Sequence, residues 1–322
     1  MSGRLKVVSI GAAVLDVFLR GKIFEPLKDD DGSMIEEFQL GTKNEVDAIT
    51  FSTGGGATNA SVTFARQGIA SFYMGNIGND IAGKAIKDEL RRENVDMSLV
   101  KVVDNENTAY SSILLAPNGE RTILTYRGAS KHYNFDQNSF LNISPDWFYI
   151  SSLSGDIQSL EAICDYAKKN DINIAINPGS GEIASHKFLR LIDSIKILSL
   201  NKEEMQKLFG ENLSIEELLI VGSKKVPLVI VTDGPKGSYV CDGHNIYKAG
   251  MYEDVTVIDR AGAGDAFSSG FVSKIITGHT IEQALTFASA NSTSVVTKIG
   301  AKEGLLHKGH RINEMKISIR KI

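Results

Sequence analysis

The fold is decided by the stretch Asp259-Arg260-Ala261-Gly262-Ala263-Gly264-Asp265-Ala266-Phe267. The four residues before it, 255–258, are all β-branched, which indicates the end of a strand. After it, apolar residues recur at helical spacing from Phe267 to Ile275. The stretch is therefore predicted to be a glycine-containing turn that opens a helix.

Such a turn suits an anionic oxygen. Gly262 and Gly264 let the backbone turn sharply, and the first N–H groups of the following helix have no internal acceptor. Asp265, in the first helical turn, could simply complement the helix dipole. A carboxylate beside free N–H donors also suits deprotonation of a hydroxyl that attacks a phosphoryl group. We favour the second interpretation because both halves of that chemistry occur together.

The same stretch resembles the C-terminal signature of the ribokinase-like (pfkB) carbohydrate kinase family, usually Asp-Thr-Thr-Gly-Ala-Gly-Asp. Arg260 and Ala261 depart from this form, whereas the glycines and the Asp do not. The resemblance implies that Asp265 is the catalytic base and that the amides of Gly262, Ala263 and Gly264 form the anion hole. It also implies an α/β, ribokinase-like fold: a central, mostly parallel sheet with helices on both faces plus a small β-sheet lid.

The bulk composition fits a single large α/β domain. The chain has 322 residues, 42% of them hydrophobic, and a net charge of −4, which gives no electrostatic case for nucleic acid. No apolar run approaches the length of a membrane span. The two cysteines, Cys164 and Cys241, lack metal or redox spacing and are predicted to be buried thiols of a cytoplasmic protein.

Strand and helix patterns alternate from Trp147 onward, which is typical of a parallel sheet covered by helices. Two β-rich segments, about 17–51 and 96–128, interrupt the N-terminal half of the single domain, residues 1–322. The second contains Asn118-Gly119 between two β-patterns, a strong hairpin signal. We expect the two segments to pair as the lid. Asp80 is predicted to cap the helix that follows it.

A second glycine-rich turn, Gly54-Gly55-Gly56, opens the helix that contains Asn59. Without context it is a flexible loop, and Asp16 beyond the first strand is a loop carboxylate. The resemblance implies that this turn, Asn59 and Asp16 bind the acceptor substrate.

Asn201 and Glu204 open a helix after a strand, where glutamates are expected for dipole reasons alone. The resemblance implies that they organise Mg²⁺ and phosphates, largely through water, a role that suits this ion. It places Asn177 near the nucleotide phosphates as well. It also implies that Asp259 belongs to a monovalent-cation site, often for K⁺, although the departures at Arg260 and Ala261 lie beside it.

The stretch Thr232-Asp233-Gly234-Pro235-Lys236-Gly237 is an ordinary turn on its own. It resembles the family's nucleotide loop, in which Thr232, Gly234 and Gly237 would contact phosphate or permit the turn. Ala288 and Asn291 match helix positions that border the adenine in the family. ATP is therefore the implied cosubstrate.

We predict an ATP-dependent carbohydrate kinase that phosphorylates a hydroxyl of a sugar or sugar acid. Ribokinase-, fructokinase- and 2-keto-3-deoxygluconate kinase-like acceptors stay open. Arg127 could bind an acidic sugar, and Arg121 is expected to be a surface charge. A nucleoside kinase of the same fold, stacking a base on Phe18, Phe24 or Phe38, is the alternative, and a non-catalytic regulator is a more distant one. The lid is expected to pair two copies into a homodimer.

Overall fold

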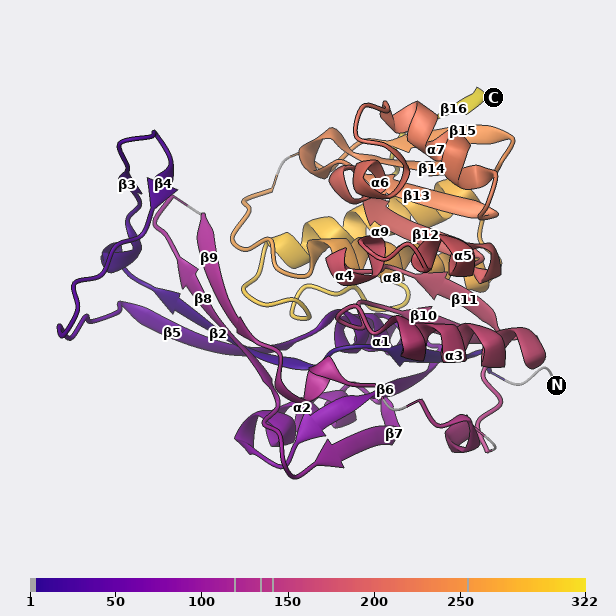
Figure 1. Cartoon of the computed structure of the whole chain (residues 1–322). Helices are drawn as coiled ribbons and strands as arrows, with labels where there is room; N and C mark the ends of the chain where they lie inside the picture. Colours follow the sequence, from indigo (N-terminus) through magenta and orange to yellow (C-terminus); the bar gives the residue numbers. More distant parts are fainter. Residues whose placement is uncertain (1–3, 119, 134, 141, 254) are drawn as a thin grey trace.

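The structure, a computed structural model, describes residues 4–118, 120–133, 135–140, 142–253 and 255–322. Its main element is a ten-stranded sheet in the order β16-β15-β14-β13-β12-β11-β10-β1-β6-β7 (Figure 1). Seven neighbouring strands are parallel: β7 (Asp96–Val103), β6 (Ala70–Gly78), β1 (Lys6–Ile10), β10 (Trp147–Ile150), β11 (Asn173–Ile176), β12 (Ile197–Asn201) and β13 (Leu228–Thr232). Three antiparallel strands extend one edge: β14 (Ser238–Cys241), β15 (Asn245–Ala249) and β16 (Ile317–Lys321).

Helices cover both faces of this sheet, which confirms the predicted fold class (Figure 1). One face carries α1 (Gly56–Arg66), α2 (Ile81–Arg92), α8 (Ala263–Ile276) and α9 (Ile281–Val296). The other carries α3 (Ile157–Lys169), α4 (Ser180–Ile183), α5 (Phe188–Leu191), α6 (Lys202–Phe209) and α7 (Ile215–Ser223).

Two apolar cores follow from the alternation of side chains along the strands. Val8 and Ile150 pack into the core under α3, α6 and α7, whereas Val7 and Tyr149 pack into the core under α1, α8 and α9. Because both faces are buried, the strands are apolar at nearly every position. Cys164 and Cys241 are free, buried thiols, as expected. None of the described helices is long and apolar enough to cross a membrane.

The lid is a separate four-stranded sheet in the order β5-β2-β8-β9. Its strands are β2 (Val14–Arg20), β5 (Ala48–Gly54), β8 (Ala109–Leu115) and β9 (Arg121–Tyr126). β8 and β9 form the predicted hairpin, although Gly119 of its turn lies outside the described residues. Phe18, Ile113 and Leu115 on one face of the lid pack toward Ala261 and Ile299 of the main body.

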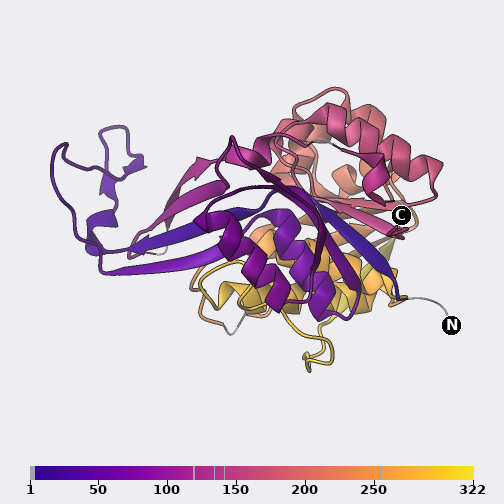
Figure 2. The same cartoon turned by 90° about the horizontal axis from the view of Figure 1, so that it is seen from below.

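Two boundaries differ from the sequence prediction. Asp16 lies inside the lid strand β2 rather than in a loop, because the chain extends again three residues after Gly11. Residues 96–103 form β7, which pairs with β6 in the main sheet, so the second lid segment begins at β8. Figures 1 and 2 show a further arm between β2 and β5 that projects beyond the lid and contains the short hairpin β3 (Leu27–Lys28) and β4 (Met34–Ile35).

Asp80 caps α2, as predicted, and also ties this helix to the start of β8. Its side chain accepts hydrogen bonds from Gly83 N at 2.7 Å, Thr108 N at 2.8 Å and Thr108 Oγ1 at 2.7 Å. Burial acts to raise the pKa of Asp80, but these hydrogen bonds outweigh it and the pKa is lowered from 3.8. The folded state therefore favours the carboxylate.

We expect Asp80→Ala to lower the free energy of unfolding by about 1–2 kcal/mol at pH 7, because a cap and its buried donors lose their acceptor. Since the native pKa is below the unfolded value, this stabilisation is present above the unfolded pKa and is lost as pH falls through the native pKa. Urea unfolding at several pH values measures it. Asp88→Ala, which removes an exposed carboxylate from the same helix, is the control. Equal effects of the two substitutions would contradict the capping role.

Candidate active site

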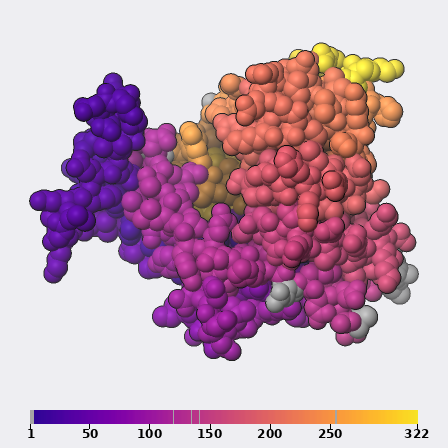
Figure 3. All heavy atoms as spheres, in the orientation of Figure 1, coloured from indigo at the N-terminus to yellow at the C-terminus, as the bar shows by residue number. Residues whose placement is uncertain are grey.

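The first turns of two helices meet beside the lid. α1 contributes Asn59 and α8 contributes Asp265, and Asn59 Nδ2 donates a hydrogen bond of 2.8 Å to Asp265 Oδ2. Figure 3 shows the surface hollowed between the lid and the main body. Helix N-termini favour anions, and open α/β sheets bind ligands at the carboxyl ends of their strands. The Asn59–Asp265 pair therefore marks the candidate site.

The glycine turn before α1 brings further polar groups to this pair. A Cβ at Gly54 would lie 2.0 Å from Asp16 Oδ2, so only glycine allows Asp16 its present position. A Cβ at Gly56 would lie 2.7 Å from Ser151 Oγ and 3.1 Å from Asp265 Oδ1. The turn thus lies between the lid carboxylate on one side and the base candidate on the other.

Gly55 fixes the direction of α1 and of Asn59. It precedes the helix with a φ of +98°, a conformation that favours glycine, and its carbonyl accepts from Asn59 N at 2.9 Å. Asn59 Oδ1 is buried and has no hydrogen-bond partner among the described residues. A buried acceptor without a donor is costly. A hydroxyl group of a bound molecule would supply the missing donor.

The residues of the predicted anion hole lie at the start of α8. Gly262 is left-handed, with a φ of +74°, and the helical ladder begins with Ala266 N donating to Gly262 O at 2.8 Å. Ala263 N donates within the turn to Arg260 O at 3.3 Å. The amides of Gly264 and Asp265 have no acceptor in the described part of the chain. Of the predicted amides, that of Ala263 is therefore used within the turn and that of Gly264 is free, and the free amide of Asp265 lies one residue beyond the predicted set.

The two carboxylates of the site have raised pKa values. Burial raises the pKa of Asp265, against the lowering effects of the Asn59 hydrogen bond and of the charge on Lys302. Burial also raises the pKa of Asp16, while Lys302 and a hydrogen bond from Ser111 lower it. A carboxylate with a raised pKa is a better proton acceptor at neutral pH, provided that it stays ionised.

A cavity of about 270 Å³ opens on the other side of the α8 N-terminus. Its lining includes Thr232, Gly234 and Gly237 from the predicted nucleotide loop together with Ala263 and Gly264 from the anion turn. The two motifs are far apart in sequence, and the structure brings them to one cavity. An elongated anion could therefore contact both.

Ala288 and Asn291 do not line this cavity. Both side chains are fully buried, and Asn291 Nδ2 donates to Ala266 O at 2.8 Å while its Oδ1 accepts from Leu306 N at 2.8 Å. The α9 residues that do line it are Ser289, Ser292, Thr293 and Val296. One face of α9 packs on α8 and another face borders the cavity. Asn291 lies on the packed face, where its amide joins neighbouring segments.

Asn201 and Glu204 form a reciprocal cap at the start of α6. Glu204 N donates to Asn201 Oδ1 and Asn201 N donates to Glu204 Oε2, each at 2.9 Å. Burial raises the pKa of Glu204. Asn177, after β11, donates to Ser199 O at 2.8 Å. The side chains of all three lie at the carboxyl ends of neighbouring strands, and each makes a structural hydrogen bond.

Two arginines of the lid region contact the main body. Arg121 Nη1 lies 3.7 Å from Asp259 Oδ1, and the Asp259 side chain is fully buried. The expectation of a surface charge is therefore wrong for Arg121, whose side chain is only 28% exposed. Arg127 is exposed and donates to Ser154 Oγ at 3.1 Å.

Two groups near the site have no counterpart in the sequence prediction. Ser151 lies at the end of β10, where its hydroxyl faces the glycine turn. Lys302 is buried in the loop after α9, beneath the same turn. A single lysine in a polar, glycine-containing segment is expected to be exposed, so no sequence signal identified it.

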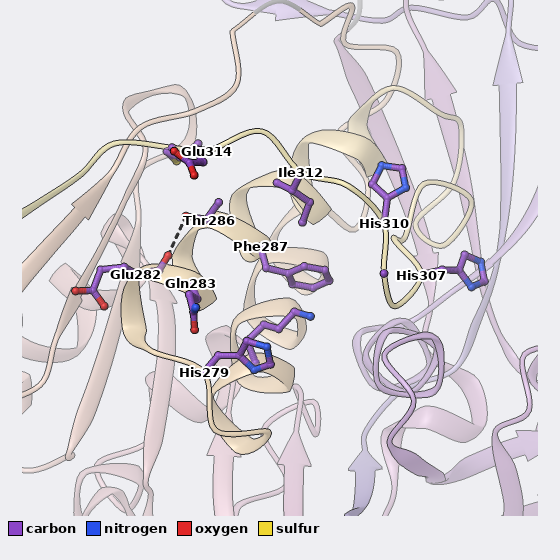
Figure 4. A pocket seen from close by; sticks show the side chains of 12 residues that line it. His279, Glu282, Gln283, Thr286, Phe287, His307, His310, Ile312 and Glu314 are labelled. Atoms are coloured by element: carbon purple, nitrogen blue, oxygen red, sulfur yellow. Dashed lines mark hydrogen bonds between the residues drawn. The ribbon is translucent and has the colours of Figure 1, made fainter.

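A second hollow, of about 370 Å³, lies at the opposite end of α8 (Figure 4). His279, Phe287, His307 and His310 border it, with Glu282 and Glu314 across from them. Its α8 member, Lys274, is nine residues beyond Asp265, about 14 Å along a helix. None of the predicted site residues lines this hollow, which therefore is no candidate for the same chemistry.

Comparisons with known proteins identify the family of this chain. The sequence model of the pfkB family carbohydrate kinases matches residues 6–308. The chain is 28% identical to a ribokinase of Haemophilus influenzae over 260 residues, which cover 78% of this chain and 83% of that protein. It is 26% identical to an ATP-dependent 6-phosphofructokinase of Thermoanaerobacterium thermosaccharolyticum over 272 residues, 80% of this chain and 83% of that protein.

A solved structure shares the fold. The nucleoside kinase of Methanocaldococcus jannaschii, an archaeal member of the ribokinase family, superposes with a TM-score of 0.76 at 22% identity, covering 95% of this chain and 96% of that one. At such identity the likeness shows the fold, and the match over residues 6–308 shows the family. The chain belongs to the pfkB family of carbohydrate kinases, as its glycine-rich turn predicted, and is a kinase.

Proposed function

We propose that this chain transfers the γ-phosphoryl group of ATP to a hydroxyl of a sugar or sugar acid, with Asp265 as the base. One observation carries the proposal. The Asp265 carboxylate, held by Asn59, lies directly beside the unpaired amides that open α8. A base and an anion site in contact are what hydroxyl attack on a phosphoryl group requires.

In the proposed reaction, these groups account for the proton and for each bond that forms or breaks. The acceptor hydroxyl gives its proton to the Asp265 carboxylate as its oxygen bonds to the γ-phosphorus, and the bond from that phosphorus to the β–γ bridging oxygen breaks to release ADP. The amides of Gly264 and Asp265 stabilise charge on the transferring group. Asn59 Oδ1 and Asp16 accept hydrogen bonds from other hydroxyls of the acceptor and hold it in place.

The cavity of about 270 Å³ is the proposed ATP site, since it joins the loop at Thr232–Gly237 to the anion turn. Glu204 and Asn201 would hold Mg²⁺ through water, because one Glu204 oxygen is committed to the helix cap and Mg²⁺ retains much of its hydration. When bound there, Mg²⁺ would neutralise negative charge on the nucleotide phosphates.

A sugar acceptor is preferred to a nucleoside on one observation. Phe18 packs on the inner face of the lid, whereas Phe24 and Phe38 contact each other on the arm, with ring centroids 6.1 Å apart. The three rings therefore do not form one stacking pocket.

Arg127, at the end of the lid hairpin, would bind the carboxylate of an acidic sugar after its hydrogen bond to Ser154 is broken.

We expect Asp265→Asn to lower kcat by about 10²- to 10⁴-fold while the substrates still bind, because the amide keeps the shape and loses the proton acceptor. ADP release is measured with ATP, Mg²⁺ and ribose, fructose, fructose 6-phosphate, 2-keto-3-deoxygluconate, adenosine or cytidine. Calorimetry on the variant measures binding. Full activity of the variant would remove Asp265 from its role. Turnover of nucleosides alone would favour the nucleoside kinase, and binding without any turnover the regulator.

A monovalent cation at Asp259 does not fit the arrangement of this chain. The Asp259 oxygens accept from Ala261 N at 2.9 Å and Gly300 N at 3.1 Å, and the Arg121 guanidinium already supplies positive charge on the Oδ1 side. A second cation at the same carboxylate would be repelled. We propose that turnover does not depend on K⁺.

For wild type, kcat should be the same in potassium chloride and in tetramethylammonium chloride at equal ionic strength. Arg121→Ala should lose about tenfold in kcat, about 1.4 kcal/mol, in tetramethylammonium chloride and recover part of it in potassium chloride. Lys43→Ala, which removes an exposed cation from the arm between β4 and β5, is the control. A strict potassium requirement of the wild type would overturn the proposal.

We also propose a homodimer formed by the outer face of the lid. Strand register places Ile49, Phe51, Tyr110, Leu124 and Tyr126 on one face, and all five are substantially exposed. The opposite face packs toward the main body. An apolar sheet face of this kind favours pairing with a second copy.

Phe51→Glu is expected to shift the protein from dimer to monomer in sedimentation at micromolar concentration, because it places a charge in the proposed interface. The Phe51 side chain is 61% exposed in the single chain, so its loss costs little folding stability. Ile81→Glu, at an exposed apolar position on α2, is the matched control. A wild-type monomer at all concentrations would rule out the interface.

Cytoplasmic location is a further proposal. Cys164 and Cys241 are both free and buried, and burial raises the pKa of the Cys164 thiol to about 12. Thiols of this kind are unreactive packing groups and fit a reducing compartment.

A further inference from the structure

Lys302 is a buried cation that the proposed reaction does not yet use. Its side chain is 1% exposed, in the loop that follows α9. Its Nζ donates to Thr53 O at 2.7 Å and to Thr53 Oγ1 at 2.9 Å. Arg66 holds the same loop from outside by donating to Lys302 O at 3.0 Å and Leu305 O at 2.6 Å. The ammonium group is therefore fixed in position.

Its acceptor is the residue before the glycine turn. Thr53 immediately precedes the glycine turn. In that turn Gly54 lies against Asp16 and Gly56 lies against Asp265. The Thr53 hydroxyl donates in turn to Glu89 of α2. Lys302 thus anchors the point at which the lid strand β5 enters the acceptor side of the site.

A charge at this depth persists only when opposite charges surround it. Burial lowers the pKa of Lys302, and Glu89, Asp16, Asp265 and Glu93 raise it. In return, Lys302 lowers the pKa of Asp265 and of Asp16 against their own burial. These carboxylates come from three elements: Asp16 from β2, Glu89 and the C-cap residue Glu93 from α2, and Asp265 from α8.

The other groups around Asp265 act in the opposite sense or carry no charge. Asn59 of α1 is neutral. Tyr149 of β10 has a raised pKa, from burial and then from the charge of Asp265, and is neutral. Asp259 and Asp265 each act to raise the pKa of Asp16. Lys302 is the cation that acts on both Asp16 and Asp265, whereas Arg121 lies beside Asp259.

We propose that Lys302 is a positioning residue for phosphoryl transfer, a buried cation anchored to Thr53 that holds the glycine turn between Asp265 and Asp16 and whose charge acts on both carboxylates. The proposal rests on the proposed function for its kinetic consequences. It assigns Lys302 no contact with the acceptor or with ATP, since none of the residues lining the nucleotide cavity is Lys302.

The kinetic test compares kcat against pH for wild type, Lys302→Met and Lys302→Gln. Without the cation, the pKa of Asp265 should rise, so the acid limb of the profile should move up by about one pH unit and kcat on that limb should fall by up to about tenfold. The deficit should shrink as pH rises, and KM for ATP should not change. Lys302→Gln keeps one donor for Thr53 O and serves if the Met variant does not fold.

Lys298→Met removes an exposed lysine from the same loop and is the control for net charge. It should leave the profile unchanged. If both Lys302 variants keep the wild-type profile, Lys302 is a structural residue and the proposal fails. An equal shift in Lys298→Met would also overturn it, since the effect would then come from overall charge.

A second measurement does not depend on turnover. Urea unfolding at pH 7 of wild type, Lys302→Gln, Asp265→Asn and the double variant forms a thermodynamic cycle. Lys302→Gln should destabilise the wild type more than it destabilises Asp265→Asn, because the second background lacks the paired charge. Additive effects would show that the two residues are not coupled. If no acceptor is turned over, this cycle still tests Lys302 while the proposed function fails by itself.

Discussion

The hydrogen bond from Asn59 to Asp265 is the contact on which the site depends. It joins the N-termini of two helices that pack on the same face of the sheet, and each helix is preceded by a glycine turn. Buried carboxylates lose solvation, and at Asp265 an amide donor and an internal ammonium group offset part of that loss, so the pKa is still raised. Asp16 and Ser151 in turn lie against the glycines of the turn that opens α1.

Much of this arrangement could be predicted because it depends on local backbone rules. Glycines at 262 and 264 before an apolar helical pattern indicate a turn that opens a helix, and Asp80 before α2 indicates a cap. The alternation of strands and helices after Trp147 predicts the parallel sheet in the same way. The family match then confirmed the fold and the kinase class together.

The remainder depends on contacts that no local pattern shows. The sequence pattern of a strand such as β7 is the same whether the strand joins the lid or the main sheet, because tertiary packing determines which strand it pairs with. Asn291 looks like a site residue in sequence, yet both ends of its amide are used to join α8, α9 and residue 306. Lys302 and Arg121 are the reverse case, since lysines and arginines are usually exposed. Here Lys302 is buried against Thr53 and Arg121 lies beside Asp259, each from a distant segment.

The spacing of the site along the chain also has a consequence for biosynthesis. Asn59 and Asp265 are separated by 206 residues, and Lys302 lies still further toward the C-terminus. At ribosomal speeds of about 5–20 residues per second, the glycine turn at 54–56 is exposed for roughly 10–40 s before α8 exists to cover it. During that interval Asp16 and Asn59 lack Asp265, the turn at Gly262–Gly264 and the buried cation Lys302. The proposed site is therefore complete only after residue 302 has been made, and its N-terminal half exists first without the rest.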